Sequence, residues 1–186
     1  MKIIDIIKNV ATLLSKEEEY EYLAKVQTEP SIETLKNVDL MTRLANLVIR
    51  ELSEGLICMV EQEQVSNKSS VDFSSLTKMP LSVIGVYDEN GAELTYSLSQ
   101  YGVTTSSGCI SKIKYSYLPS NYGLEDEIGT FEKPVTANIL TYGVLAEYCL
   151  TEGRFDEAVM WNNRYSENID NLCKPKNGMV KSRNFV

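Results

Sequence analysis

The sequence predicts an α+β fold in which a helical bundle core is interrupted by a small antiparallel β insertion. Three observations support this fold class: apolar residues spaced as in helices near both ends, strand-like alternation in the middle, and an Asn90-Gly91 pair between two alternating runs. The strand-like runs stand together between helical blocks, which is typical of α+β proteins. We expect the insertion to be a sandwich or barrel.

The expected organisation has five consecutive parts. They are the N-terminal helices of the core (1–61), the β insertion (62–120), an acidic loop (121–134), a C-terminal helical hairpin (135–174) and an extended tail (175–186). Because neither helical block can bury its apolar face alone, we expect the first and last helices to pack together.

Helical spacing predicts three helices in the N-terminal block. The first has an apolar face of Ile3, Ile4, Ile6, Ile7, Val10, Leu13 and Leu14. Ser15 and Glu18 have the spacing of a capping box for a second, short helix over 16–27. After Pro30, a long helix is expected with Asp39 as its N-cap. Its apolar face would contain Leu40, Leu44, Leu47, Val48, Leu52 and Met59.

Alternation of apolar and polar residues predicts the strands. Residues 81–99 form two alternating runs around Glu89, Asn90 and Gly91, which indicates a hairpin. Residues 109–119 alternate in the same way, and residues 70–76 are a candidate for a further strand.

Two helices joined by a tight turn are expected in the C-terminal hairpin. Thr136 is the predicted N-cap of the first helix, and Gly153 the predicted turn, while Gly143 and Ala146 allow the two helices to approach closely. The packed face of the second helix would contain Phe155, Ala158, Asn162, Tyr165, Ile169 and Leu172. We interpret Trp161, beside this stripe, as a packing residue.

Composition argues against several classes of function. The net charge of −8 argues against a surface that binds nucleic acid. The absence of histidine removes the commonest general base and most zinc sites. The acidic stretch 123–129 lacks the ligand spacing of a calcium loop. We therefore expect no enzyme, metal site or cofactor.

The sequence was also searched for membrane spans, a signal peptide and paired cysteines. No apolar run is long enough to span a membrane, and the first helix is interrupted by charges, unlike a signal peptide. The four cysteines form no CxxC pair, and because no secretory signal is found they are expected to be reduced, buried thiols: Cys58, Cys109, Cys149 and Cys173.

The end of the chain is basic although the whole chain is acidic. The last 13 positions hold 4 of the 18 basic residues and finish in Phe185-Val186. A segment with glycine, proline and few apolar residues will not pack unaided. It is interpreted either as a frayed terminus or as an interaction tail that becomes ordered on a partner.

The order of these parts resembles the head-to-tail connector or adaptor proteins of tailed bacteriophages, in particular the tail tubular proteins of short-tailed phages. The stretches that carry the resemblance are LANLVIREL, VIGVYDENG, YGVLAEYCLTEGRFDEAVMWNNRYSENIDNL and VKSRNFV. The chain is also similar to the smaller all-helical connectors of long-tailed phages, which lack the β insertion.

The resemblance implies a structural protein of the virion, assembled in the host cytoplasm. It implies a homo-oligomeric ring, twelve-fold by resemblance, that joins the portal protein to a tail or nozzle protein. Genome DNA would pass through its channel without specific binding. The tail would dock on the portal through Lys176, Lys181, Arg183, Phe185 and Val186.

Charged helix faces could set the register between subunits of such a ring. The candidates for these contacts are Glu17, Glu18 and Glu19 on one subunit and Arg43, Arg50 and Arg154 on its neighbour.

An alternative function is a protein-interaction adaptor of the tetratricopeptide type. The helical hairpin resembles one such helix pair, with Ala146, Tyr148, Gly153, Phe155 and Ala158 near the expected positions. That architecture needs stacked copies at a fixed period, and the sequence has no second copy.

Overall fold

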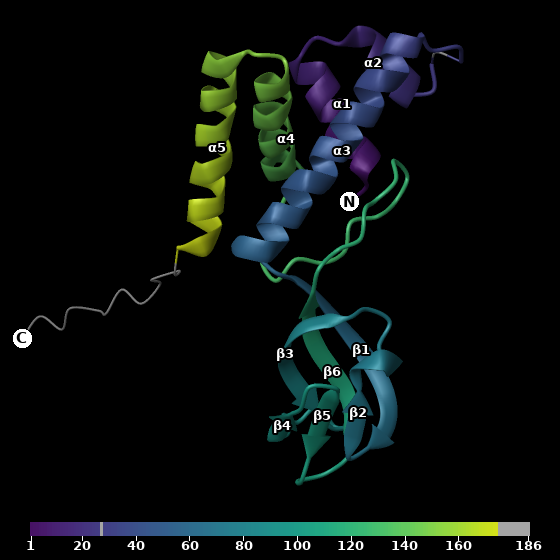
Figure 1. Ribbon diagram of the computed structural model, residues 1–186, viewed down its shortest axis with the longest axis vertical. Helices are drawn as coiled ribbons and strands as arrows, with labels where there is room; N and C mark the ends of the chain where they lie inside the picture. Colours follow the sequence, from purple (N-terminus) through teal and green to yellow (C-terminus); the bar gives the residue numbers. More distant parts are fainter. Residues whose placement is uncertain (27, 175–186) are drawn as a thin grey trace, which may run out of the picture.

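The protein is described by a computed structural model, which covers residues 1–26 and 28–174 (Figure 1). It is a mixed α+β protein, as predicted. The helical part consists of α1 (Ile3–Leu13), α2 (Glu17–Leu23), α3 (Ile32–Gly55), α4 (Ala137–Thr151) and α5 (Phe155–Cys173). The β part consists of β1 (Met59–Lys68), β2 (Ser70–Asp72), β3 (Pro80–Tyr87), β4 (Tyr96–Leu98), β5 (Gly102–Thr105) and β6 (Ile110–Tyr117).

The first and last helices pack together, as predicted. Helix α4 contacts α1, α3 and α5 and is therefore the centre of the helical part. Most of its side chains are buried because neighbours cover it on several sides. Helix α1 buries most of the predicted face, but Leu13 is exposed and Leu14, just after the helix, is half-buried.

Helix α3 differs from the prediction at both ends. It begins at Ile32, because the hydroxyl oxygen of Ser31 accepts a hydrogen bond from the Thr34 backbone N–H at 3.0 Å and caps the first turn. Asp39 lies inside the helix and pairs with Arg43, so it is not the N-cap. The helix ends at Gly55, and Met59 begins β1 and does not extend the helical stripe.

The predicted face of α3 is partly right, because Leu44, Val48 and Leu52 are buried. Leu47 is 40% exposed, whereas Met41, Ala45 and Ile49 are buried. The prediction missed Met41 and Ile49 because the helix starts earlier and packs on both α1 and α4.

The capping box predicted at Ser15 is absent. Ser15 has a φ of 55° and is the left-handed residue of the α1–α2 turn, while Lys16 occupies the N-cap position of α2 without a side-chain cap. This turn folds α2 back against α1.

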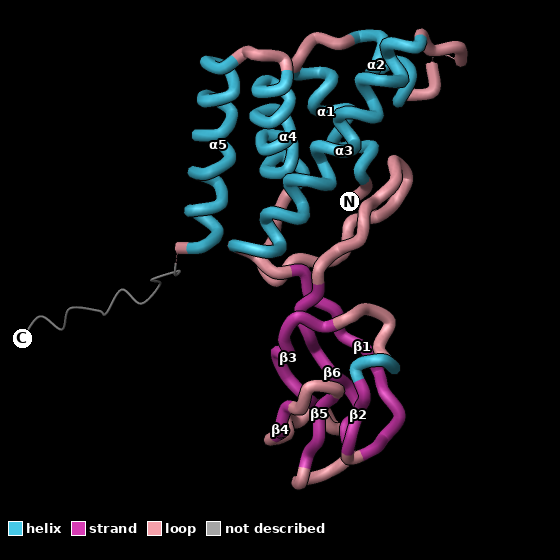
Figure 2. The backbone as a smooth tube through the Cα atoms, viewed as in Figure 1, coloured by secondary structure: helices cyan, strands magenta, loops and turns pink. Residues whose placement is uncertain are grey.

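The strands form two three-stranded antiparallel sheets, in the orders β1-β6-β3 and β2-β5-β4, and not a barrel (Figure 2). The turn at Asn90-Gly91 is present: Gly91 has a φ of 81° and the Asp88 N–H donates to the Ala92 carbonyl at 3.0 Å. The predicted hairpin is only partly right, because β3 pairs with β6 and β4 pairs with β5. The strand predicted at 70–76 is β2, followed by a 3₁₀ turn at Phe73–Ser75.

The acidic loop is attached to the helical part by backbone hydrogen bonds and is not merely solvated. The N–H of Ile4 donates to the Leu124 carbonyl at 2.9 Å, and the N–H of Ile128 donates to the Met1 carbonyl at 2.9 Å. Asn46 of α3 donates to the Tyr122 carbonyl at 2.9 Å and accepts from the Tyr122 N–H at 2.6 Å.

The C-terminal hairpin forms as predicted. Thr136 is the N-cap of α4, and Gly153 makes the turn with a φ of 72°. A Cβ on Gly143 would lie 2.7 Å from a methyl carbon of Val48, so only glycine permits this approach.

The packed face of α5 is partly different from the predicted one. Ala158 and Ile169 are buried, but Phe155 is 66% exposed and Asn162 is exposed. Trp161 fills the place between α4 and α5 and stacks on Tyr142 with ring centroids 5.8 Å apart, which confirms its role in packing.

Candidate interaction surfaces

The described residues contain little that could support catalysis by a metal. No group of three or more His, Cys, Asp or Glu side chains among them could hold an ion. Within residues 1–26 and 28–174, no helix is both long and apolar enough to cross a membrane. All four cysteines are free; Cys149 is buried as predicted, whereas Cys109 is exposed.

The β part contains one cluster of polar side chains, on the sheet that holds β1, β6 and β3. Glu63 accepts hydrogen bonds from the Tyr115 hydroxyl and from the backbone N–H of Thr77. Partial burial opposes ionisation of Glu63, but these hydrogen bonds prevail and lower its pKa. Burial and the bond to Glu63 raise the pKa of Tyr115.

Lys78 extends the same cluster. Its ammonium lies 2.8 Å from the Glu61 carboxylate and 3.9 Å from the centroid of the Tyr117 ring. The carboxylates of Glu61 and Glu63 therefore both have donors within the protein. Since Thr77 and Lys78 immediately precede β3, these contacts hold that connecting segment on the sheet.

The α2 carboxylates predicted to contact a neighbouring subunit have different surroundings. Glu19 is only 6% exposed; Lys16 lies 3.5 Å from its carboxylate and Asn37 donates to it at 2.6 Å. Glu19 therefore stabilises the α2–α3 contact and is not a surface group. Glu18 is exposed and accepts from the Thr34 hydroxyl at 3.1 Å, and Glu17 is exposed.

The arginines predicted to contact those carboxylates are exposed and paired along their own helices. Arg43 pairs with Asp39, and Arg50 with Glu54 at 2.8 Å. Arg154 pairs with Glu157 at the start of α5. Exposed pairs of this kind are weak, so these guanidinium groups can exchange partners at little cost. Their contacts with another subunit stay a prediction.

The residues predicted to dock on a portal lie outside the described residues. These are Lys176, Lys181, Arg183, Phe185 and Val186.

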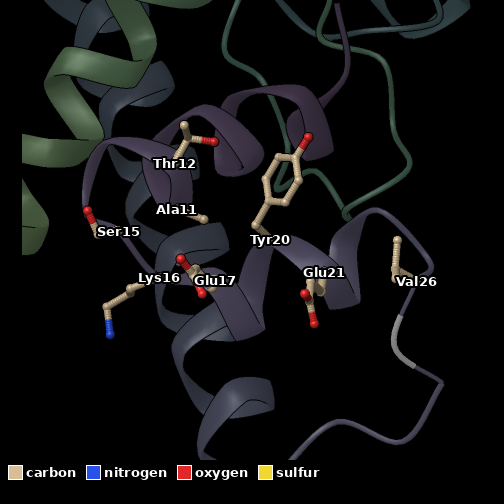
Figure 3. Close-up of a pocket in the computed structure, with 8 residues that line it drawn as sticks. All are labelled: Ala11, Thr12, Ser15, Lys16, Glu17, Tyr20, Glu21 and Val26. Atoms are coloured by element: carbon tan, nitrogen blue, oxygen red, sulfur yellow. The ribbon is translucent and has the colours of Figure 1, made fainter.

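A groove between α1 and α2 was not predicted from the sequence. This α1–α2 groove has a volume of about 530 Å³ and is lined by Ala11, Thr12, Ser15, Lys16, Glu17, Tyr20, Glu21 and Val26. Figure 3 shows the Tyr20 ring rising from α2 beside α1, with Glu17 and Glu21 along the same helix. The only signal in the sequence was a few apolar residues in a helix that is otherwise rich in carboxylates. This signal did not predict a groove, because the groove forms only when the turn at Ser15 folds α2 back against α1.

Two outer helices of the helical part carry exposed apolar side chains. On and after α2, Tyr20 is 44% and Val26 is 71% exposed. On α5, Phe155 and Val159 are both well exposed. Because α5 packs on α4 while α2 packs on α1 and α3, these two surfaces lie on different flanks of the helical part (Figure 1).

No known protein family and no curated protein matches this chain.

Proposed function

We propose that this chain is a structural assembly protein, a head-to-tail connector of a tailed bacteriophage that forms a ring between the portal and the tail. We propose further that the helices form one bundle core and that the β part is an insertion into it. In this arrangement the acidic surface would line a channel that DNA crosses without binding.

The observation that carries the proposal is the pair of unlike apolar surfaces on two flanks of the helical part. A surface that contacts a different surface on the next copy makes a heterologous interface, and such interfaces close into rings when the rotation permits. Exposed Phe155 and Val159 on one flank, and Tyr20 and Val26 on the other, are two such surfaces, and each can contact a different part of a neighbouring copy. Clustered exposed apolar groups of this kind are typical of interaction sites.

The tetratricopeptide alternative has weaker support. Among the described helices, α4 and α5 are the hairpin in question, and the other faces of α4 are covered by α1 and α3. A peptide groove formed by stacked hairpins therefore has no counterpart around α4.

Native mass spectrometry of the full chain, alone and mixed with a portal protein from the same genome, tests the proposal. We expect a closed oligomer alone, or a monomer that assembles when the portal protein is added. A chain that stays monomeric and unbound under both conditions would contradict the proposed function.

A further inference from the structure

The α1–α2 groove combines an apolar wall with an acidic rim. Ala11 and the Tyr20 ring supply apolar surface, and Glu17 and Glu21 stand four residues apart on α2. Neither of these two carboxylates has a salt-bridge partner within the part of the chain that the structure describes. A segment that carries both cations and a large apolar side chain would complement this surface.

One segment of this chain has that chemistry. The chain has a net charge of −8, of which residues 175–186 contribute +3, so the rest carries −11. Lys181 and Arg183 precede Phe185 in this segment, which contains no acidic residue. By contrast, the exposed start of α5 carries Asp156 and Glu157, which Glu17 and Glu21 would repel. Charge therefore selects residues 175–186 over the tip of α5 as the occupant.

The length of the segment favours a groove on another copy. Lys16 of the groove lies over the Tyr148 ring in the last turn of α4, at 5.5 Å, so the groove is at the end of the helical part opposite to Lys174. The 19 residues of α5 span about 28 Å.

The route across the helices adds to this distance. This route runs sideways from α5 past α4 to α1 and α2. Three steps between neighbouring helices at ordinary packing distances amount to about 25 Å. The straight line is then about 38 Å, whereas residues 175–185 reach at most about 36–40 Å when fully extended. Because a straight path would pass through α4, a chain cannot comfortably reach its own groove.

We propose that residues 175–186 of one copy bind the α1–α2 groove of a second copy, with Phe185 beside Tyr20 and the Lys181 and Arg183 side chains beside Glu17 and Glu21. The segment thereby straps neighbouring subunits together. This inference rests on the proposed function only in requiring a second copy of the chain beside the first, and it needs no portal protein.

A photocrosslinking experiment on the purified full chain tests the strap. Phe185 is replaced by benzoylphenylalanine, and light and ¹⁵N-labelled chains are mixed before irradiation. We expect crosslinks from position 185 to peptides within residues 11–26, including pairs in which one peptide is light and the other heavy. Crosslinks that only join a chain to itself, or that fall outside 11–26, would overturn the proposal.

Charge reversal supplies the matched comparison. The double variant E17K/E21K should lower the crosslink yield about tenfold, since two attractive pairs become repulsive. The control variant E89K/E93K makes the same change in net charge on exposed residues of the β part and should leave the yield unchanged. Equal yields from both double variants would contradict the proposed pairing.

The outcome is independent of portal binding. If crosslinking fails while a portal protein still binds the full chain, the strap is wrong and the connector function stands. If crosslinking succeeds and no portal protein binds, the strap stands and the connector function is wrong.

Discussion

The helical part and the β part bury their apolar side chains in different ways. In the helical part, α1 and α3 from the start of the chain enclose α4 from near its end, so the core needs residues that are far apart in sequence. In the β part, the strand pairs all lie between residues 59 and 117. Among the described elements, every extensive contact is helix with helix or strand with strand.

The two parts meet where the chain leaves and re-enters the helical part. The Val60 N–H donates to the Thr130 carbonyl at 2.8 Å, and the Glu132 N–H donates to the Cys58 carbonyl at 2.9 Å. The β part is therefore local in sequence, whereas the helical part can form only after both ends of the chain are present.

The largest effects are expected from matched truncations in the two cores. Ile49→Ala in α3 and Ile113→Ala in β6 each remove a side chain that is at most 1% exposed. Each should lower the free energy of unfolding by about 2–5 kcal/mol, because a cavity is left behind.

Native-state hydrogen exchange distinguishes the parts in these two variants. Ile113→Ala should speed exchange mainly in residues 59–117, and Ile49→Ala mainly in the helices. Equal acceleration throughout the molecule by both variants would mean that the two parts open as one unit.

A second prediction concerns the contact between α3, α4 and α5. Gly143→Ala should destabilise the protein by about 1–3 kcal/mol, because the new Cβ would meet Val48 at 2.7 Å and Tyr165 at 3.1 Å. The control is Gly55→Ala at the end of α3, where the added Cβ meets nothing within 4 Å. Urea unfolding of both variants measures the difference, and equal stabilities would contradict the close packing at Gly143.

The C-terminal hairpin could be predicted from sequence because its signals are local. Gly153 marks the turn and Gly143 marks a close helix contact, but the tightest approach at Gly143 is to Val48 of α3, which the local pattern did not indicate. The limits of α3 were mispredicted since Met59 happens to continue the helical spacing, and because aspartate at position 39 is as favourable a capping residue as Ser31.

Features that depend on tertiary contacts could not be predicted. A sandwich or barrel was expected, and the barrel is wrong, because β4 pairs with β5 and the strands divide into two three-stranded sheets. Likewise, the α1–α2 groove depends on the left-handed Ser15 turn, where the sequence suggested a capping box.

A smaller effect is expected where the acidic loop joins α3. Asn46→Ala removes the two hydrogen bonds to the Tyr122 backbone and should cost about 1–3 kcal/mol, because half-buried backbone groups lose their partner. Hydrogen exchange of residues 120–128 should become faster. Asn163→Ala, at an exposed position of α5, is the control and should have no such effect. Unchanged exchange in the Asn46 variant would show that the loop is held in another way.

The smallest predicted effect is a pH dependence at Glu147. Partial burial and the Glu51 carboxylate raise the pKa of Glu147. A raised pKa in the folded state means that ionised Glu147 disfavours folding, so its penalty is absent below pH 4.5 and appears as the pH rises through the folded pKa. Glu147→Gln should therefore stabilise the protein by about 0.5 kcal/mol at about pH 7 and by nothing at about pH 4.

Urea unfolding at the two pH values measures this difference. Glu167→Gln, which changes an exposed carboxylate of α5, serves as the control. A stabilisation by Glu147→Gln that is equal at both pH values would contradict the electrostatic explanation.

The most direct test of the comparison is to remove the β part. Met59 and Tyr117 are cross-strand partners, so residues 60–116 can be replaced by an Asn-Gly turn that joins them. Circular dichroism during urea unfolding should show a helical protein with one cooperative transition, because both ends of the chain still enclose α4. A variant that is unfolded, or that loses its helices gradually without a transition, would contradict the proposal that the β part is an insertion into a helical core.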